Sequence, residues 1–225
     1  MILKPIRPRI LSLQKIPNAH EALLIGYGAN PEKHTSLALI TVDQDDSTYV
    51  ALDEATKHAN VDVVFAKSFY AGSAHSSGKL SGEILGVLAG RDPDEVEEGI
   101  KATIRCLEED ACFYSANEDA TITFFPHVIS SVGYYLAAQT GLQPGESLAY
   151  LVAPPIEATM GFDAAAKGSN AAFVKIFPPP TETNFAAAWL TGDLNSCETA
   201  AEIFAETIIE VARNPKVYMN MRDSI

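Results

Sequence analysis

The clearest chemical signal in the sequence is a run of carboxylates, Asp43-Gln-Asp-Asp46, directly after the apolar segment 37–42. The run lies between a predicted strand and a predicted helix, where Asp46 or Ser47 is expected to cap the helix. Three aspartates exceed what capping needs, and the matching segment 153–157 of the second half has one carboxylate. Two interpretations stay open: a solvated cap, or a cation site for a metal bound through oxygen ligands or for an organic ammonium.

Charge and composition limit the class of partner. The 225 residues are 47% hydrophobic, and 29 acidic against 16 basic residues give a net charge of −13. This composition is typical of a folded domain, and the acidic balance argues against a nucleic-acid partner, whose phosphates need clustered Lys and Arg. No apolar stretch approaches a membrane span and the N-terminus lacks the pattern of a signal peptide, so a cytoplasmic protein is expected.

Enzyme signatures are missing from the sequence. The five histidines stand in unrelated contexts, and no serine lies in a nucleophile-elbow motif. The three cysteines, Cys106, Cys112 and Cys197, are an odd number without CxxC spacing, so free thiols are expected. The residues therefore carry no catalytic signature, and the interpretation that the protein is not an enzyme rests on its resemblance to a known protein family.

An internal repeat organises the elements that must position the acidic run. The segment Ala51-Leu-Asp-Glu-Ala-Thr-Lys57 matches Gly161-Phe-Asp-Ala-Ala-Ala-Lys167 at a shift of 110 positions. Hydrophobic periodicity predicts the order β-α-β-α-β-β-α in each half. The two Asp-x-x-x-Lys pairs, Asp53 with Lys57 and Asp163 with Lys167, are expected to form i, i+4 ion pairs on their helices.

The domain boundary is expected near residues 109–120, where charged and turn residues interrupt the helical period. This gives a first domain over 1–110, a second over 111–215, and a C-terminal tail, 216–225, that is predicted to be mobile. Helices join only some of the predicted strands. Each domain is therefore expected to be α+β, with a mixed, mainly antiparallel sheet and helices on one face.

Two loops in equivalent positions differ in kind. Residues 67–79 are rich in Gly and Ser, whereas residues 177–184 begin with a run of prolines. A flexible loop on a rigid scaffold is a candidate gate, and a merely long hairpin connection is the alternative.

Several motifs together resemble the ethanolamine-utilization shell proteins of bacterial microcompartments. They are the tandem repeat itself and the segments 43–49, 68–75, 149–158 and 178–185, in this order along the chain. The resemblance implies two tandem, circularly permuted microcompartment domains, with three chains forming a pseudohexameric disc. It also implies edge-to-edge contact with other shell proteins, with Lys57 and Lys167 at the tile edge.

The resemblance further implies ethanolamine as a regulatory ligand and a gated central pore. The residues that correspond to the ligand site are Asp45, Asp46, Glu83, Phe113, Glu182, Thr183 and Asn184. The residues that correspond to the pore gate are Phe69, Tyr70, Ala71, Gly72, Ser73, Ala74 and His75. No cofactor is required; zinc and cobalamin are further ligands associated with such proteins, and Asp43, Asp45 and His75 form an unspecific candidate set for a metal.

The resulting hypothesis is a structural, trimeric shell tile in the bacterial cytoplasm. Its central pore is expected to transport a metabolite or cofactor, and bound ethanolamine is expected to regulate the opening of that pore. It predicts neither nucleic-acid nor membrane partners. Two alternatives remain: a tile of a different metabolosome with another small ligand, or a soluble small-amine-binding protein or enzyme that uses the same acidic cleft.

Overall fold

The computed structural model describes residues 4–69, 80–181 and 183–216, and these fall into two compact units built from separated pieces of the chain. The N-terminal unit comprises residues 7–112 and 129–146. The C-terminal unit comprises the described parts of 1–6, 113–128 and 147–225. Within the described residues, no helix combines the length and the apolarity needed to cross a membrane. The predicted boundaries at 110 and 215 stay a prediction, since a repeat in sequence and a compact unit divide a chain by different criteria.

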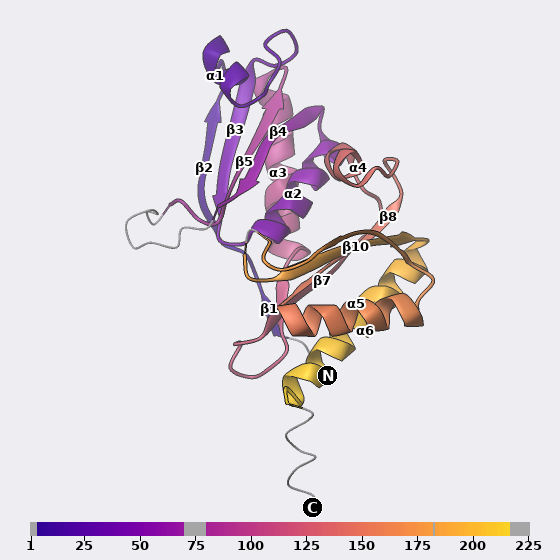
Figure 1. The fold of residues 1–225 in the computed structure, drawn as a ribbon. Coiled ribbons are helices and arrows are strands. Elements are labelled where there is room, and N and C mark those ends of the chain that lie inside the picture. The colour runs from indigo at the N-terminus through magenta and orange to yellow at the C-terminus, as the bar shows by residue number, and fades with distance from the viewer. Residues whose placement is uncertain (1–3, 70–79, 182, 217–225) are drawn as a thin grey trace, which may run out of the picture. The chain divides into compact units, whose positions relative to one another are not determined.

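The N-terminal unit is a four-stranded antiparallel sheet with helices (Figure 1). Its elements are β2 (Ile10–Ile16), α1 (Glu21–Gly26), β3 (Ser36–Val42), α2 (Asp45–His58), β4 (Val61–Ser68), β5 (Ile84–Gly90), α3 (Pro93–Glu109) and α4 (Tyr134–Thr140). The strand order is β2-β3-β5-β4, and β3 pairs with β5 over its full length, from Ser36 with Gly90 to Val42 with Ile84. The central strands read as apolar runs because both of their faces are covered.

Different helices pack on the two faces of this sheet. Leu52 of α2 packs so closely on Gly86 of β5 that a Cβ at Gly86 would lie 2.7 Å from the leucine Cδ1. On the opposite face, Leu24 of α1 joins Leu37 and Val87 in a separate core cluster. The expectation that helices cover one face only is wrong for this unit, because α1 is a single short turn with four consecutive apolar residues, which show no period that would indicate a side.

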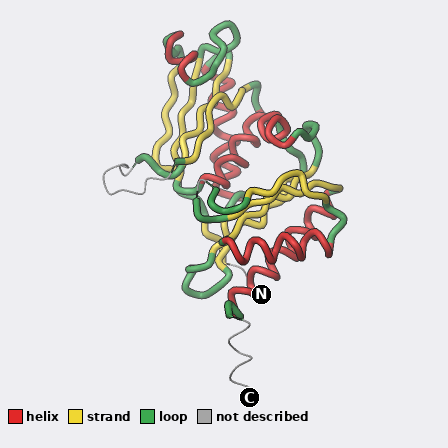
Figure 2. The backbone as a smooth tube through the Cα atoms, in the orientation of Figure 1, coloured by secondary structure: helices red, strands yellow, loops and turns green. Residues whose placement is uncertain are grey.

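The C-terminal unit repeats the pattern with a six-stranded sheet. Its elements are β1 (Lys4–Ile6), β6 (Phe113–Ser115), β7 (Thr123–Ile129), β8 (Ser147–Ala153), α5 (Pro155–Gly168), β9 (Ala172–Phe177), β10 (Ala186–Gly192) and α6 (Leu194–Arg213). The strand order is β1-β6-β7-β8-β10-β9, and the pairs with recorded register are antiparallel. Figure 2 shows α5 and α6 together on one face of this sheet.

The repeat extends to register and packing. Strands β8 and β10 pair over seven positions, from Ser147 with Gly192 to Ala153 with Ala186, as β3 and β5 do. Gly161 of α5 lies against the ring of Phe204 in α6, where a Cβ would meet the ring at 2.5 Å. The order β-α-β-α-β-β-α is confirmed in both halves. The short strands β1 and β6 were not expected, because three residues are too few to show a period.

Candidate functional site

Sheet topology brings the acidic run of the N-terminal unit close to a second acidic position. Strand β3 delivers Asp43 and then Asp45 at its end, and β5 begins directly after Glu83. The two strands are neighbours, and the backbone N–H of Glu83 donates to the carbonyl of Val42 at 2.8 Å. Residues separated by about forty positions in sequence therefore share one end of the sheet.

Helix α2 begins at Asp45, before either predicted cap residue. Its N-cap is Gln44, whose side chain makes no capping hydrogen bond, so the expected cap by Asp46 or Ser47 is wrong. Ser47 instead donates to the side-chain oxygen of Gln44 at 2.9 Å, and Thr48 donates to the Gln44 carbonyl at 2.6 Å. Asp45 and Asp46 lie in the first turn of α2, where the helix dipole stabilises their negative charges.

Asp45 is buried, and neighbouring groups fix the orientation of its carboxylate. Its Oδ2 accepts from the hydroxyl of Ser68 at 2.6 Å, and its Oδ1 accepts from the N–H of Asp46 at 2.9 Å. The N–H of Ser68 in turn donates to the hydroxyl oxygen of Tyr49 at 3.0 Å. Sequence reasoning missed Ser68 and Tyr49. Ser68 is the last residue of an apolar strand, so the sequence indicates where it lies in the fold but not that it binds a carboxylate.

The electrostatics of this cluster favour an added positive charge. Partial burial and then the charges of Asp45 and Asp43 raise the pKa of Glu83 above its ordinary value. Asp43 is neutralised in part by Arg9, whose Nε lies 2.7 Å from Oδ2 and whose backbone N–H donates to Oδ1. Within the described ranges, no cationic side chain pairs with Asp45 or Glu83. An ammonium placed beside them would reduce the repulsion among the carboxylates.

Gly82 shapes the turn that presents Glu83. Its φ is +66°, and a Cβ there would collide with the backbone oxygen of Val42 and lie 3.1 Å from Cδ1 of Leu11. Sequence reasoning did not single out this glycine, because a turn glycine is common and only the structure shows its close approach to a backbone atom.

We expect Gly82→Ala to lower the free energy of unfolding by about 1–3 kcal/mol, because the left-handed conformation and the collision both oppose a side chain. Urea unfolding followed by circular dichroism measures this. The matched control is Gly26→Ala, a position with open space around its added Cβ, which should shift stability far less. Equal effects of the two substitutions would contradict the role given to Gly82.

The other predicted ligand residues belong to the C-terminal unit. Phe113 of β6 is half-buried and packs on Phe125, with ring centroids 5.0 Å apart. Thr183 accepts from the N–H of Phe185 at 3.2 Å, and Asn184 is exposed. Glu182 lies outside the described residues. Their assignment to one ligand with Asp45 and Glu83 stays a prediction.

Of the predicted gate, the structure describes Phe69 alone. Its N–H donates to the carbonyl of Glu83 at 2.9 Å, so the residue that begins the loop is attached to the acidic position. Tyr70, Ala71, Gly72, Ser73, Ala74 and His75 lie outside the described residues. Of the metal candidates, Asp43 pairs with Arg9, and the part of the chain that the structure describes holds no group of three or more His, Cys, Asp or Glu suited to a metal ion.

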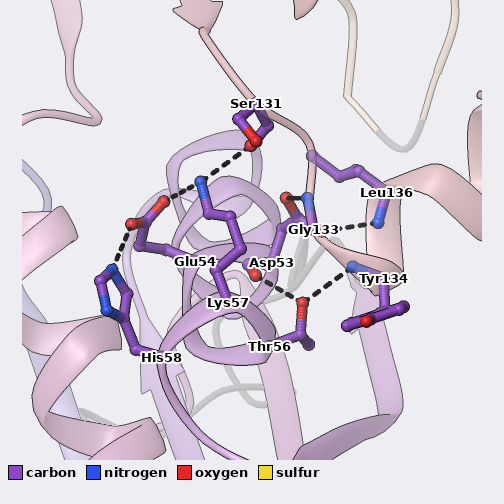
Figure 3. Close-up of polar contacts among 9 residues, drawn as sticks. All are labelled: Asp53, Glu54, Thr56, Lys57, His58, Ser131, Gly133, Tyr134 and Leu136. Carbon is purple, nitrogen blue, oxygen red and sulfur yellow. Dashed lines mark hydrogen bonds and ion pairs between the residues drawn. The ribbon is translucent and has the colours of Figure 1, made fainter. Parts of the chain in front are cut away.

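The two predicted edge lysines have different environments. Lys167 pairs with Asp163 at 2.6 Å on the exposed surface of α5, as expected. Lys57 does not pair with Asp53. It pairs with Glu54 and donates to the carbonyl of Ser131 at 3.0 Å (Figure 3), and its side chain is 23% exposed.

Asp53 is the centre of a polar network that holds residues 131–136 on α2 (Figure 3). The residue is 1% exposed, and its carboxylate accepts from the N–H of Gly133 at 2.6 Å and of Leu136 at 2.8 Å. Thr56 accepts from the N–H of Tyr134 at 3.0 Å. Burial raises the pKa of Asp53, although the two backbone hydrogen bonds lower it in part. Asp53 thereby caps α4 from another helix.

Comparison with known proteins places this architecture in a family. The BMC domain model matches residues 36–117. The bacterial microcompartment shell protein EutL of Clostridium perfringens is 48% identical over 210 residues, covering 93% of this chain and 96% of that protein. The EutL protein of Salmonella typhimurium is 42% identical over 210 residues, covering 93% of this chain and 95% of that protein.

Solved structures agree with these relatives. The crystal structure of EutL from Clostridium perfringens matches with a TM-score of 0.92 at 46% identity, covering 98% of this chain and all of that one. The ethanolamine utilization protein EutL from Leptotrichia buccalis matches with a TM-score of 0.90 at 44% identity, covering 96% and 99%. The EutL proteins of Clostridium perfringens and Salmonella typhimurium are named as shell proteins and not as enzymes, in agreement with the non-enzymatic interpretation. The chain belongs to the EutL family of bacterial microcompartment shell proteins.

Proposed function

We propose that this shell protein works as a trimeric, pseudohexameric tile with a gated central pore, and that ethanolamine bound at the acidic cluster regulates the pore. Membership of the EutL family supports the structural role, and one relative is named an ethanolamine utilization protein. In this proposal the tile meets other shell proteins edge to edge, within a microcompartment in the bacterial cytoplasm. The same proposal places Lys57 and Lys167 at that edge. It requires no cofactor.

The observation that carries the ligand proposal is the uncompensated charge of Asp45 and Glu83. Protonated ethanolamine offers N–H donors and one positive charge, which both carboxylates can accept in charge-assisted hydrogen bonds. Ser68 holds Asp45 in place, so the carboxylate is oriented before the ligand arrives. The family resemblance adds Phe113, Glu182, Thr183 and Asn184 to the same proposed ligand site, with Phe113 offering a cation–π face.

The gate proposal depends on the Gly- and Ser-rich composition of residues 67–79. Support from the described residues is the bond between the N–H of Phe69 and the carbonyl of Glu83, which attaches the start of that segment to the ligand position. A ligand that binds one pore state better shifts the population by its difference in affinity and no more. Zinc and cobalamin as further ligands stay predictions from the resemblance.

Isothermal titration calorimetry tests the ligand. We expect ethanolamine to bind at millimolar or lower concentration, and ethylene glycol, which lacks the ammonium, to give no heat. Heat from neither compound with folded protein would overturn the ethanolamine proposal. Equal binding of both would overturn the role of the carboxylates.

Electron microscopy tests the structural role separately. We expect the purified protein to form ordered sheets or arrays, because tiles meet along repeated edges. A protein that stays dispersed at all concentrations and consumes a small amine would instead support the alternative of a soluble binding protein or enzyme.

A further inference from the structure

Arg9 and Asp43 continue the ladder between β2 and β3 beyond the ends of both strands. Strand β2 begins at Ile10 and β3 ends at Val42, and these two residues are register partners. One position further, the N–H of Asp43 donates to the carbonyl of Arg9 at 3.2 Å. The return bond goes to a side chain, because the N–H of Arg9 donates to Oδ1 of Asp43 at 2.7 Å. The carboxylate of Asp43 thus closes this end of the ladder.

The side chain of Arg9 occupies the second oxygen of the same carboxylate. Its Nε donates to Oδ2 of Asp43 at 2.7 Å, so each oxygen of Asp43 accepts a hydrogen bond from Arg9. The Arg9 side chain is 78% exposed, and ion pairs of such exposed cations contribute little to stability. The backbone bonds hold the rung, whereas the guanidinium adds a positive charge.

This charge lies close to the proposed ligand position. In the strand order, β3 stands between β2 and β5, so Arg9 and Glu83 flank Asp43 on opposite sides. Neighbouring strands are about 4.8 Å apart, which places the backbones of Arg9 and Glu83 about 10 Å from each other. Charges at this separation interact in dilute salt, because the Debye length is about 10 Å at 0.1 M ionic strength.

The charge of Asp43 also reaches Glu83. Burial first, and then the charges of Asp45 and Asp43, raise the pKa of Glu83. Arg9 neutralises Asp43 and occupies its oxygens, whereas Asp45 and Glu83 have no ion pair within the described part of the chain. A cation that binds here therefore meets two available carboxylates; without the Arg9 side chain it would meet three.

We propose that Arg9 determines the specificity of this acidic cluster, Asp43, Asp45 and Glu83, by withholding Asp43 and so favouring a singly charged ammonium over a divalent metal ion. The inference rests on the proposed function, in which the cluster binds a protonated amine. A divalent ion such as Ca²⁺ takes six to eight oxygen ligands and gains from each added carboxylate. An ammonium needs only acceptors for its N–H groups.

The Arg9 guanidinium also repels the two kinds of cation unequally. Coulomb energy is proportional to charge, so the repulsion of a divalent ion is twice that of an ammonium at the same distance. If loss of the Arg9 charge strengthens the binding of an ammonium by one factor, it strengthens the binding of a divalent ion by the square of that factor.

Arg9→Gln tests this specificity by calorimetry at pH 7.5 in dilute buffer, with ethanolamine and with Ca²⁺, which prefers oxygen ligands to histidine or cysteine. We expect binding to tighten about threefold for ethanolamine and about tenfold or more for Ca²⁺. Both gains should shrink in about 0.5 M salt, which screens the charges. Arg9→Lys keeps the positive charge and should keep the wild-type preference.

The double variant Arg9→Gln with Asp43→Asn separates charge from structure. It removes both members of the ion pair, so its affinities for ethanolamine and Ca²⁺ should return to those of the wild-type protein. The matched control is Arg91→Gln, which removes an exposed cation at the opposite end of β5 from Glu83. At about 3.4 Å per residue the strand separates the two by more than twice the Debye length, so the control should bind as the wild-type protein does.

Two results would overturn the role of Arg9: an unchanged ratio of Ca²⁺ to ethanolamine affinity in Arg9→Gln, or an equal gain in the double variant. A wild-type protein that binds no ethanolamine would overturn the proposed function instead. The Ca²⁺ affinity of Arg9→Gln relative to the double variant would then still decide whether Arg9 withholds Asp43 from a bound cation.

Discussion

Asp53→Ala is expected to lower the free energy of unfolding by about 2–4 kcal/mol. The substitution leaves the buried N–H groups of Gly133 and Leu136 without their acceptor, and each such loss costs about 1–3 kcal/mol. Relief of the buried charge offsets part of this cost, as the raised pKa of Asp53 indicates. Urea unfolding at one fixed chain concentration measures the difference, because the stability of a protein that assembles depends on its concentration.

Asp53→Asn separates hydrogen bonding from charge. The amide of the substituted side chain keeps one acceptor oxygen. Asp53→Asn should therefore lower the free energy of unfolding by about half as much as Asp53→Ala does. The raised pKa of Asp53 means that the folded state holds this proton more tightly than the unfolded state does. Stability from this group is therefore highest below the ordinary aspartate pKa and falls as pH rises through the raised folded value, and Asn should remove that fall.

The control for both substitutions is Glu202→Gln, at an exposed acid of α6, which should change the free energy of unfolding by less than about 0.5 kcal/mol. If Asp53→Ala unfolded at the same urea concentration as this control, the carboxylate would not be holding the α4 turn.

Glu83→Gln is expected to weaken ethanolamine binding roughly tenfold, the loss of about 1.4 kcal/mol of interaction with the ammonium. In the wild-type protein the pKa of Glu83 is raised, so a cation that prefers the ionised carboxylate drives off a proton when it binds. Affinity should therefore rise as pH rises through the pKa of Glu83 and level off above it.

Calorimetry in two buffers of different ionisation enthalpy counts the released protons. Glu83→Gln should release fewer protons than the wild-type protein in the acidic range, and Glu108→Gln, at an exposed acid of α3, should behave as the wild-type protein does. Unchanged affinity and proton release in Glu83→Gln would show that ethanolamine binds elsewhere.

Local patterns predicted the elements of the fold because helices such as α3 and α6 carry a helical period and the central strands are short apolar runs. Helix α3 shows why: Asp92 caps it by accepting from two backbone N–H groups at 3.0 Å, and Pro93 occupies its first position. The family followed from long motifs in order. The start of α2 was missed because Gln44 is not a typical cap residue.

Long-range partners of single side chains could not be predicted. An Asp and a Lys four positions apart predict an ion pair on one helix, and that is correct for Asp163 with Lys167. For Asp53 the backbone of Gly133, 80 positions away, supplies better partners, and no local pattern encodes them. In the acidic cluster, Asp45 could be selected from the sequence because it is one of three aspartates in a short run. Ser68 could not be selected, because its contact with Asp45 exists only once the chain has folded.

If the protein forms the proposed pseudohexameric ring, the docking of the α4 turn on α2 is a ring contact that is already made within one chain. In a ring of single-domain subunits every such contact is made by encounter between molecules. Fusing two domains turns every second contact into an intramolecular one, with an effective concentration in the range of about 1 mM or more for a short connection. In the proposed ring, three fused chains would need two encounters where six single-domain subunits would need five. Duplication also frees the two copies of each surface to diverge, as Thr56 and Ala166, which correspond at the repeat shift of 110, have done.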